Sequence, residues 1–132
     1  MSKTLVVCLS DDNGMMFNNR RQSRDLKVTE KVLQMAERTK LWVSEYSVKL
    51  FPTGNIFQNF SKDGLYFIEN PDLLTQDIID EFKNIVVFRW NRDYPADKFF
   101  NFDIQYHEMI DCEEFEGNSH EKITMENYKK KG

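Results

Sequence analysis

The sequence has few of the residues on which several common protein classes depend. It contains only two cysteines, Cys8 and Cys112, and both lie in apolar, strand-like segments. This pattern predicts reduced, buried thiols and no disulfide framework. The chain has no His-x-His, His-x-x-x-His or paired Cys-x-x-Cys spacing, so no zinc site is expected. The Gly-x-Gly-x-x-Gly and Gly-Lys-Ser/Thr sequences of the known phosphate loops are also missing, and we expect no bound metal and no cofactor.

Long apolar runs and excess positive charge are missing as well. The N-terminal stretch MSKTLVVCL is too short for a signal peptide or a membrane span, which predicts a cytoplasmic protein without membrane contact. The net charge is −4, so bulk binding of nucleic acid or of anionic lipid is not expected. Only a local basic patch could serve such a ligand.

What the chain does contain is enough apolar material for one packed core. Its 132 residues are 40% hydrophobic and include eleven phenylalanines, within the range of globular domains. We therefore expect a single domain over residues 1–127, followed by a frayed basic tail at residues 128–132. The aromatic content also favours an aromatic-lined pocket.

Hydrophobic patterning predicts an alternation of strands and helices. Four short apolar runs predict buried strands, at residues 5–9, 41–44, 65–68 and 85–88. Apolar residues recur at helical spacing within residues 25–38 and 71–82, and residues 106–115 resemble a final strand. This order predicts an α/β fold, a single layered domain with a mostly parallel central sheet and antiparallel C-terminal edge strands.

Polar residues follow each predicted strand. In an open α/β sheet, ligands bind beyond the carboxyl ends of the parallel strands. If the first four strands are parallel, the polar segments after them meet at one edge. These segments, together with the one after the last predicted strand, are residues 10–13, 44–47, 69–70, 89–93 and 117–122. The sequence therefore predicts a polar site at this edge.

The segment NNRRQSRD, residues 18–25, places Arg20, Arg21 and Arg24 just before a predicted helix. Helix N-termini carry unsatisfied N–H groups and a positive partial charge, so arginines beside one strengthen its attraction for phosphate or carboxylate. Either Ser23 or Asp25 can cap this helix. The alternative is that the arginines pair with neighbouring aspartates or face solvent.

A second cluster follows the strand at 85–88, where Arg89 and Arg92 flank Trp90. An unpaired charge at the end of a buried strand is costly, so Arg89 is expected to meet a carboxylate or a ligand anion. Trp90 would stack on a planar ligand or else belong to the core or its rim.

The third cluster contains His120, one of only two histidines, between Ser119 and Glu121 and before Lys122. An imidazole titrates near neutral pH, so His120 is the best acid–base candidate, with Ser119 or Glu121 as a helper. Lys122 would add charge for a ligand. The alternative is an ordinary polar loop or the start of a helical turn. His107 lies within a predicted strand, where a structural role is expected.

Residues 14–25, 89–97 and 117–124 contain the sequences GMMFNNRRQSRD, RWNRDYPAD and GNSHEKIT. In these segments the chain resembles a family of small uncharacterised bacterial proteins, some of which are labelled ribonuclease Z. The resemblance covers nearly the whole chain and implies that the three segments belong together. The metal motif of the metallo-β-lactamase fold, on which true ribonuclease Z depends, is absent here, so the resemblance supplies no catalytic residues.

The beginning of the chain is also similar to the start of dihydrofolate reductases. There too an apolar first strand leads through a Gly-containing loop to an acidic residue at a helix start, a place that Asp25 would occupy here. This likeness implies a distant dihydrofolate-reductase-like protein. The Gly-Gly cofactor signature of that family is absent from the rest of the chain.

Together these patterns predict a protein that binds an anionic, phosphate-bearing, nucleotide-like small molecule at the strand ends. If it is an enzyme, phosphoester hydrolysis is the reaction class that suits these groups best. The predicted ligand-binding residues are Arg20, Arg21, Ser23, Asp25, Arg89, Trp90, Arg92 and Lys122, and the predicted catalytic residues are His120, Ser119 and Glu121.

An alternative from another class is a non-enzymatic protein-interaction module, such as a regulator or an inhibitor encoded by a mobile element. The acidic residues 111–116 would then dock a basic protein partner, or the chain would form a homo-oligomer. Arginines that converge in a concave pocket favour the ligand site, whereas a flat exposed display favours the protein partner.

Overall fold

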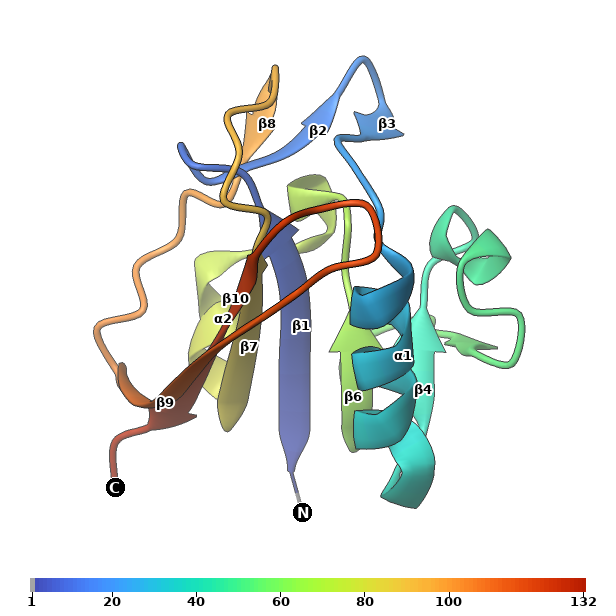
Figure 1. Cartoon of the computed structure of the whole chain (residues 1–132). Helices are drawn as coiled ribbons and strands as arrows, with labels where there is room; N and C mark the ends of the chain where they lie inside the picture. The colour runs from blue at the N-terminus through green and yellow to red at the C-terminus, as the bar shows by residue number, and fades with distance from the viewer. Residues whose placement is uncertain (1) are drawn as a thin grey trace.

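A mixed seven-stranded sheet forms the centre of the computed structural model, which describes residues 2–132 (Figure 1). From one edge to the other, its strands are β5 (Asn55–Ile56), β4 (Leu41–Val43), β6 (Gly64–Phe67), β1 (Lys3–Leu9), β7 (Asn84–Arg89), β10 (Ile123–Lys130) and β9 (His107–Phe115). The first five of these are parallel, and β10 is antiparallel to both of its neighbours. This arrangement confirms the predicted α/β fold class with a mostly parallel sheet.

The central strands are buried because they are apolar on both faces. The LVVCL run of β1 lies beside the IVVF run of β7, with Leu5 opposite Ile85 and Val7 opposite Val87. These side chains are at most 3% exposed. Successive side chains of a strand point to opposite faces, so Leu5 and Val7 belong to one core cluster and Val6 to the other.

Two helices cover opposite faces of the sheet. Helix α1 (Leu26–Met35) packs Val28 and Val32 against one core cluster, and helix α2 (Gln76–Glu81) packs Ile79 against the other. Three short 3-10 turns, η1, η2 and η3, span Ala36–Arg38, Ser47–Lys49 and Pro71–Leu73. Within residues 2–132, no helix is both long and apolar enough to cross a membrane.

The second predicted helix, at residues 71–82, is interrupted in the structure. Leu74 is extended after η3, and α2 begins only after Thr75. The Thr75 hydroxyl accepts a hydrogen bond from the Ile78 N–H, which is the contact of an N-cap residue. Because Thr75 starts a new helix, the apolar periodicity of residues 71–82 spans two separate elements, η3 and α2.

A small second sheet lies beyond the carboxyl ends of the central strands (Figure 1). Its strands, in order, are β3 (Arg20–Arg21), β2 (Gly14–Phe17) and β8 (Lys98–Phe99). Asn18 and Asn19 join β2 to β3 with φ angles of 51° and 58°. A two-residue hairpin of type I′ requires positive φ at both positions, and asparagine tolerates it well. We call β2 and β3 with their turn the hairpin arm.

The C-terminal strand β10 corrects the prediction of a frayed tail. It continues to Lys130, so residues 128–130 of the predicted tail belong to the sheet. Tyr128 pairs with Ile85 on one side and with Met109 on the other, and its side chain packs against the core. Charged and amide residues are frequent in this segment, so its sequence does not show the apolar alternation that predicts a strand.

The two thiols are free, but they are not equally buried. Cys8 of β1 is partly buried, whereas Cys112 of β9 is exposed. The prediction of two buried thiols is therefore wrong for Cys112, because β9 lies at the edge of the sheet, where its side chains meet solvent.

Candidate functional site

The loop between β9 and β10, residues 116–122, lies at the carboxyl edge of the parallel strands. Thr124 of β10 pairs with Arg89 at the end of β7 and with Glu114 near the end of β9, so these two strands end at the same edge. From there the loop crosses toward the N-terminal end of α1 (Figure 1). The segment after β9 thus meets the segment before α1, as the sequence predicted.

Asp25 is the centre of this meeting point. It is 3% exposed. Its carboxylate accepts hydrogen bonds from the backbone N–H groups of Lys27, Asn118 and Ser119, at 2.9, 2.9 and 2.8 Å, and from Nδ1 of His120 at 2.9 Å. Burial raises the pKa of Asp25, but these hydrogen bonds outweigh it and hold the pKa well below its ordinary value. Asp25 is therefore a buried, ionised carboxylate.

The approach of the loop to Asp25 depends on Gly117. A Cβ atom at this position would lie 2.8 Å from Oδ2 of Asp25 and 2.8 Å from the carbonyl oxygen of His120. Real Cβ atoms do not come this close to oxygen, so any other residue would push the loop away from Asp25. Gly117 is therefore required by contact rather than by its backbone angles.

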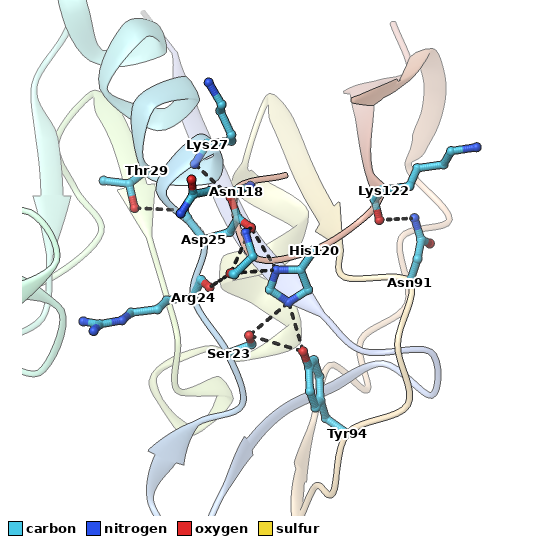
Figure 2. A network of polar contacts seen from close by, with 11 residues as sticks. Ser23, Arg24, Asp25, Lys27, Thr29, Asn91, Tyr94, Asn118, His120 and Lys122 are labelled. Carbon is cyan, nitrogen blue, oxygen red and sulfur yellow. Dashed lines mark hydrogen bonds and ion pairs between the residues drawn. The ribbon is translucent and has the colours of Figure 1, made fainter. Parts of the chain in front are cut away.

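His120 connects Asp25 to two hydroxyl groups (Figure 2). Its Nδ1 faces Asp25, and its Nε2 lies 3.1 Å from Oγ of Ser23 and 2.9 Å from the hydroxyl of Tyr94. The imidazole stacks on Trp90 with 4.7 Å between ring centroids, and His120 is 5% exposed. We call Ser23, Asp25, Tyr94, Ser119 and His120 the His120 cluster.

The structure brings five of the predicted site residues into contact with one another. They are Ser23, Asp25, Trp90, Ser119 and His120. The predicted helpers of His120 are placed differently from each other. Ser119 lies beside Nδ1, with its Oγ 3.3 Å away, whereas Glu121 is exposed. The carboxylate that contacts His120 is Asp25, which comes from the other segment.

The predicted cationic residues, in contrast, have separate surroundings. Arg21 forms a two-bonded ion pair with Glu69 at 2.6 and 3.0 Å, and this hydrogen bonding raises the pKa of Arg21. Arg89 pairs with Glu126 at 3.0 Å, so the expected carboxylate partner is present. These two charges are compensated within the protein.

The remaining predicted cations lie at the surface. Arg20 and Arg92 are exposed, and Lys122 pairs with Glu114 at 3.2 Å on the surface. Sequence reasoning did not single out Tyr94 as a site residue, although its hydroxyl contacts His120 directly. The sequence signal that could have identified Tyr94 is its position directly after the second basic cluster.

Three cavities open around the His120 cluster. The inner cavity, about 20 Å³, is lined by Ser23, Arg24, Asp25 and Trp90, among others. Beside it a cleft of about 440 Å³, which we call the α1 cleft, is lined by Arg24, Asp25, Leu26, Thr29, Lys49, Leu50, Asn118 and Ser119. A third cleft of about 520 Å³ lies along the hairpin arm and is lined by Phe17, Asn18, Arg20, Arg21, Gln22, Tyr94 and Pro95. Within residues 2–132, no three His, Cys, Asp or Glu side chains are placed to hold a metal ion.

The comparisons with known proteins identify the fold. No protein-family model matches the chain, and no curated protein matches its sequence. Among solved structures, it is similar to dihydrofolate reductase from Enterococcus faecalis complexed with NADP(H) and RAB-propyl. The TM-score is 0.77, over 99% of this chain and 97% of that chain, at 8% sequence identity. The chain has a dihydrofolate-reductase-like fold. The sequence likeness at the start of the chain therefore holds at the level of the fold.

The residues of this chain do not fit the dinucleotide that the similar structure contains. A glycine-lined turn lets the backbone approach a pyrophosphate, but β7 is followed here by Trp90, whose buried ring packs on His120. The carboxylate of Asp25 is also fully engaged by internal donors, so it has no free oxygen lone pair directed at a ligand. We therefore derive no hydride-transfer step for this chain.

Proposed function

We propose that this protein binds a small, phosphate-bearing anion in the α1 cleft. The observation that supports the proposal is a pair of uncompensated cations, Arg24 and Lys49, that line this one cleft. Neither forms an ion pair within residues 2–132. Figure 2 shows the Arg24 side chain directed away from His120. Its guanidinium is therefore free for a ligand.

The electrostatics of the cleft favour an anion. The negative charge of Asp25 is stabilised by internal hydrogen-bond donors, and the positive N-terminal end of the α1 dipole lies beside it. A guanidinium can bind phosphate through two parallel hydrogen bonds, and an ammonium adds a point charge. Leu26 and Leu50 supply apolar wall for the uncharged part of the ligand.

Thermal unfolding in the presence of inorganic phosphate, nucleotides and sugar phosphates tests this function. A ligand at 100 times its dissociation constant stabilises the folded state by about 2.7 kcal/mol, which raises the melting temperature measurably. The double variant Arg24→Ala/Lys49→Ala should lose this shift. Arg38→Ala, an exposed arginine at the opposite end of the helix, is the matched control and should keep it.

Two outcomes would contradict the proposal: no shift from any of these anions, or an undiminished shift in the double variant. The variant Arg20→Ala distinguishes the clefts, because Arg20 lines the cleft along the hairpin arm and not the α1 cleft. Loss of the shift in Arg20→Ala alone would place the anion beside the arm.

Protein binding through β9 is a second candidate, favoured by its position. The acidic residues 111–116 lie on or just after this edge strand, and Met109 and Ile110 beside them are 47% and 55% exposed. An edge strand presents unpaired backbone groups to another chain. Light scattering of the purified protein tests self-association, and a strictly monomeric protein that retains no basic partner contradicts this candidate.

A further inference from the structure

The His120 cluster contains three groups in the order that nucleophilic hydrolysis requires. Oγ of Ser23 lies 3.1 Å from Nε2 of His120, and Nδ1 of the same ring lies 2.9 Å from Oδ2 of Asp25. Ser, His and Asp recur with this connectivity on unrelated folds, where geometry and not chain position defines them. We propose that Ser23 is a nucleophile activated by His120, with Asp25 as the orienting carboxylate, and that the site hydrolyses small carboxylic esters that carry an anionic group.

The protonation of the cluster supports this assignment. Asp25 is ionised, since its hydrogen-bond donors hold its pKa low, and a carboxylate can only accept from Nδ1. The imidazole therefore carries a proton on Nδ1, and in its neutral form it presents a lone pair at Nε2. That lone pair faces the Ser23 hydroxyl, which is the proton that a general base must remove.

Among the described residues, Tyr94 is the one neighbour that shares Nε2 with Ser23. Its hydroxyl lies 2.9 Å from Nε2 and also donates toward Oγ of Ser23 at 3.4 Å. When the phenol donates to Oγ, the hydrogen of Ser23 points to Nε2. The titratable groups in contact with the imidazole are thus Asp25 and Tyr94.

Access to Ser23 sets the size of the substrate. Ser23 is only partly buried and lines the inner cavity, whose 20 Å³ holds about one water molecule. Arg24, Asp25, Thr29 and Leu50 line both this cavity and the larger α1 cleft. Arg24 is exposed, so its side chain can move, and the proposal requires that this movement connects the two spaces. A short acyl group then reaches Ser23 while the rest of the ester stays in the α1 cleft.

The reaction balances without a further reactant. Oγ of Ser23 attacks the ester carbonyl carbon while its proton moves to Nε2 of His120. The bond from that carbon to the alcohol oxygen breaks, and the alcohol leaves with the proton from Nε2. Water then attacks the acyl-serine and gives its proton to Nε2. The Ser23–acyl bond breaks, Oγ takes back that proton, and a carboxylic acid is released.

The preference for an anionic ester rests on the function proposed above, whereas the attack by Ser23 does not. Two measurements separate them. The first is labelling of the unmodified protein with a fluorophosphonate, with the labelled residue located by mass spectrometry. The second is the hydrolysis rate of p-nitrophenyl acetate compared with that of p-nitrophenyl succinate, which carries a carboxylate.

We expect the fluorophosphonate to label Ser23 and not Ser61. Ser61 is an exposed serine that lies outside the His120 cluster. Ser23→Ala should lower the hydrolysis of p-nitrophenyl acetate at least about 100-fold, and Ser61→Ala should leave it unchanged. Absence of label on Ser23 in the folded, unmodified protein overturns the proposal without relying on any variant.

The two esters show which part fails. If Ser23 is labelled but succinate and acetate esters react equally, the nucleophile stands and the anion preference is wrong. If phosphate binds in the α1 cleft but Ser23 stays unlabelled, the proposed function stands and the hydrolytic step is wrong. Arg24→Ala should abolish the preference for the succinate ester.

Discussion

The two histidines of the chain, His120 and His107, are almost equally buried, at 5% and 6% exposed. They lie at opposite ends of the parallel strands. His120 lies at the carboxyl edge, among a carboxylate and two hydroxyl groups. His107 begins β9 at the amino edge, where its Nε2 lies 2.6 Å from the carbonyl oxygen of Phe82. A carbonyl only accepts, so Nε2 donates, and the buried Nδ1 has no partner among the described residues.

This difference separates an imidazole held by one backbone contact from an imidazole that lies between an ionised carboxylate and two hydroxyl groups. His107 makes one hydrogen bond to the backbone, and its Nδ1 has no hydrogen-bond partner among the described residues. His120 has an ionised carboxylate at one nitrogen and hydroxyl groups at the other. A hydroxyl group can give a proton to Nε2, and the carboxylate offsets the positive charge that the imidazole then carries. Burial alone therefore does not distinguish the two roles, and the partners of each nitrogen do.

The largest expected effect is on Asp25. Asp25→Ala removes a buried anion and leaves its donors unsatisfied, so we expect the free energy of unfolding to fall by about 3–5 kcal/mol. Urea unfolding monitored by circular dichroism measures this. Asp72→Ala is the matched control, because Asp72 is in an exposed ion pair with Lys98 and should cost less than about 1 kcal/mol. Equal losses in the two variants would contradict the central role of Asp25.

The pH dependence of stability sharpens the same point. Because the folded protein holds the pKa of Asp25 below the ordinary value of about 3.9, its contribution is full above that pH and is lost as the pH falls below it. Melting temperatures measured from pH 7 to pH 2 should fall on the acid side. Asp25→Asn should lose part of this dependence. An unchanged acid profile in Asp25→Asn would show that the carboxylate is not the group that titrates.

A smaller loss is expected at the other edge. His107→Leu removes the donor to the Phe82 carbonyl and leaves that oxygen buried without it, which should cost about 1–3 kcal/mol. The same urea measurement applies, and the proposed hydrolysis of p-nitrophenyl acetate should not change. A change in hydrolysis rate without unfolding would break the distinction between the two histidines.

The smallest effect is expected at Ser119. Its hydroxyl contacts the Arg24 carbonyl at 3.2 Å and Oδ2 of Asp25 at 3.2 Å, while its backbone N–H already binds Asp25. Ser119→Ala removes only the hydroxyl, so the loss in unfolding free energy should be about 0.5–1.5 kcal/mol. A loss as large as that of Asp25→Ala would mean that the hydroxyl, and not the backbone, positions the loop.

Four of the parallel strands of the central sheet could be predicted because they are short apolar runs, which are typical of a parallel sheet covered on both faces. Strands β2, β3 and β8 have two to four residues, too few for periodicity to appear. Strand β10 escaped prediction because its alternation is masked by charged and amide residues.

For the site, the sequence predicts which residue types follow the relevant strands, but it does not predict which side chains pair with one another. Sequence proximity suggested Glu121 as the partner of His120, whereas the actual partner, Asp25, is 95 residues away. Only the chain topology shows this. The basic clusters were misleading in another way, because Arg21 pairs with Glu69, just after β6, and Arg89 pairs with Glu126 on β10.

Strand β10 follows β9 in the chain yet inserts between β9 and β7 in the sheet. During synthesis, the half of the sheet built on β1, β4, β6 and β7 therefore leaves the ribosome before the strand that joins β9 to it. At 5–20 residues per second, the 95 residues between Asp25 and His120 take roughly 5–20 s to appear. For that interval the nascent protein contains Ser23 and Asp25 but lacks Ser119 and His120, so the His120 cluster can close only when the last strand of the sheet is about to be made.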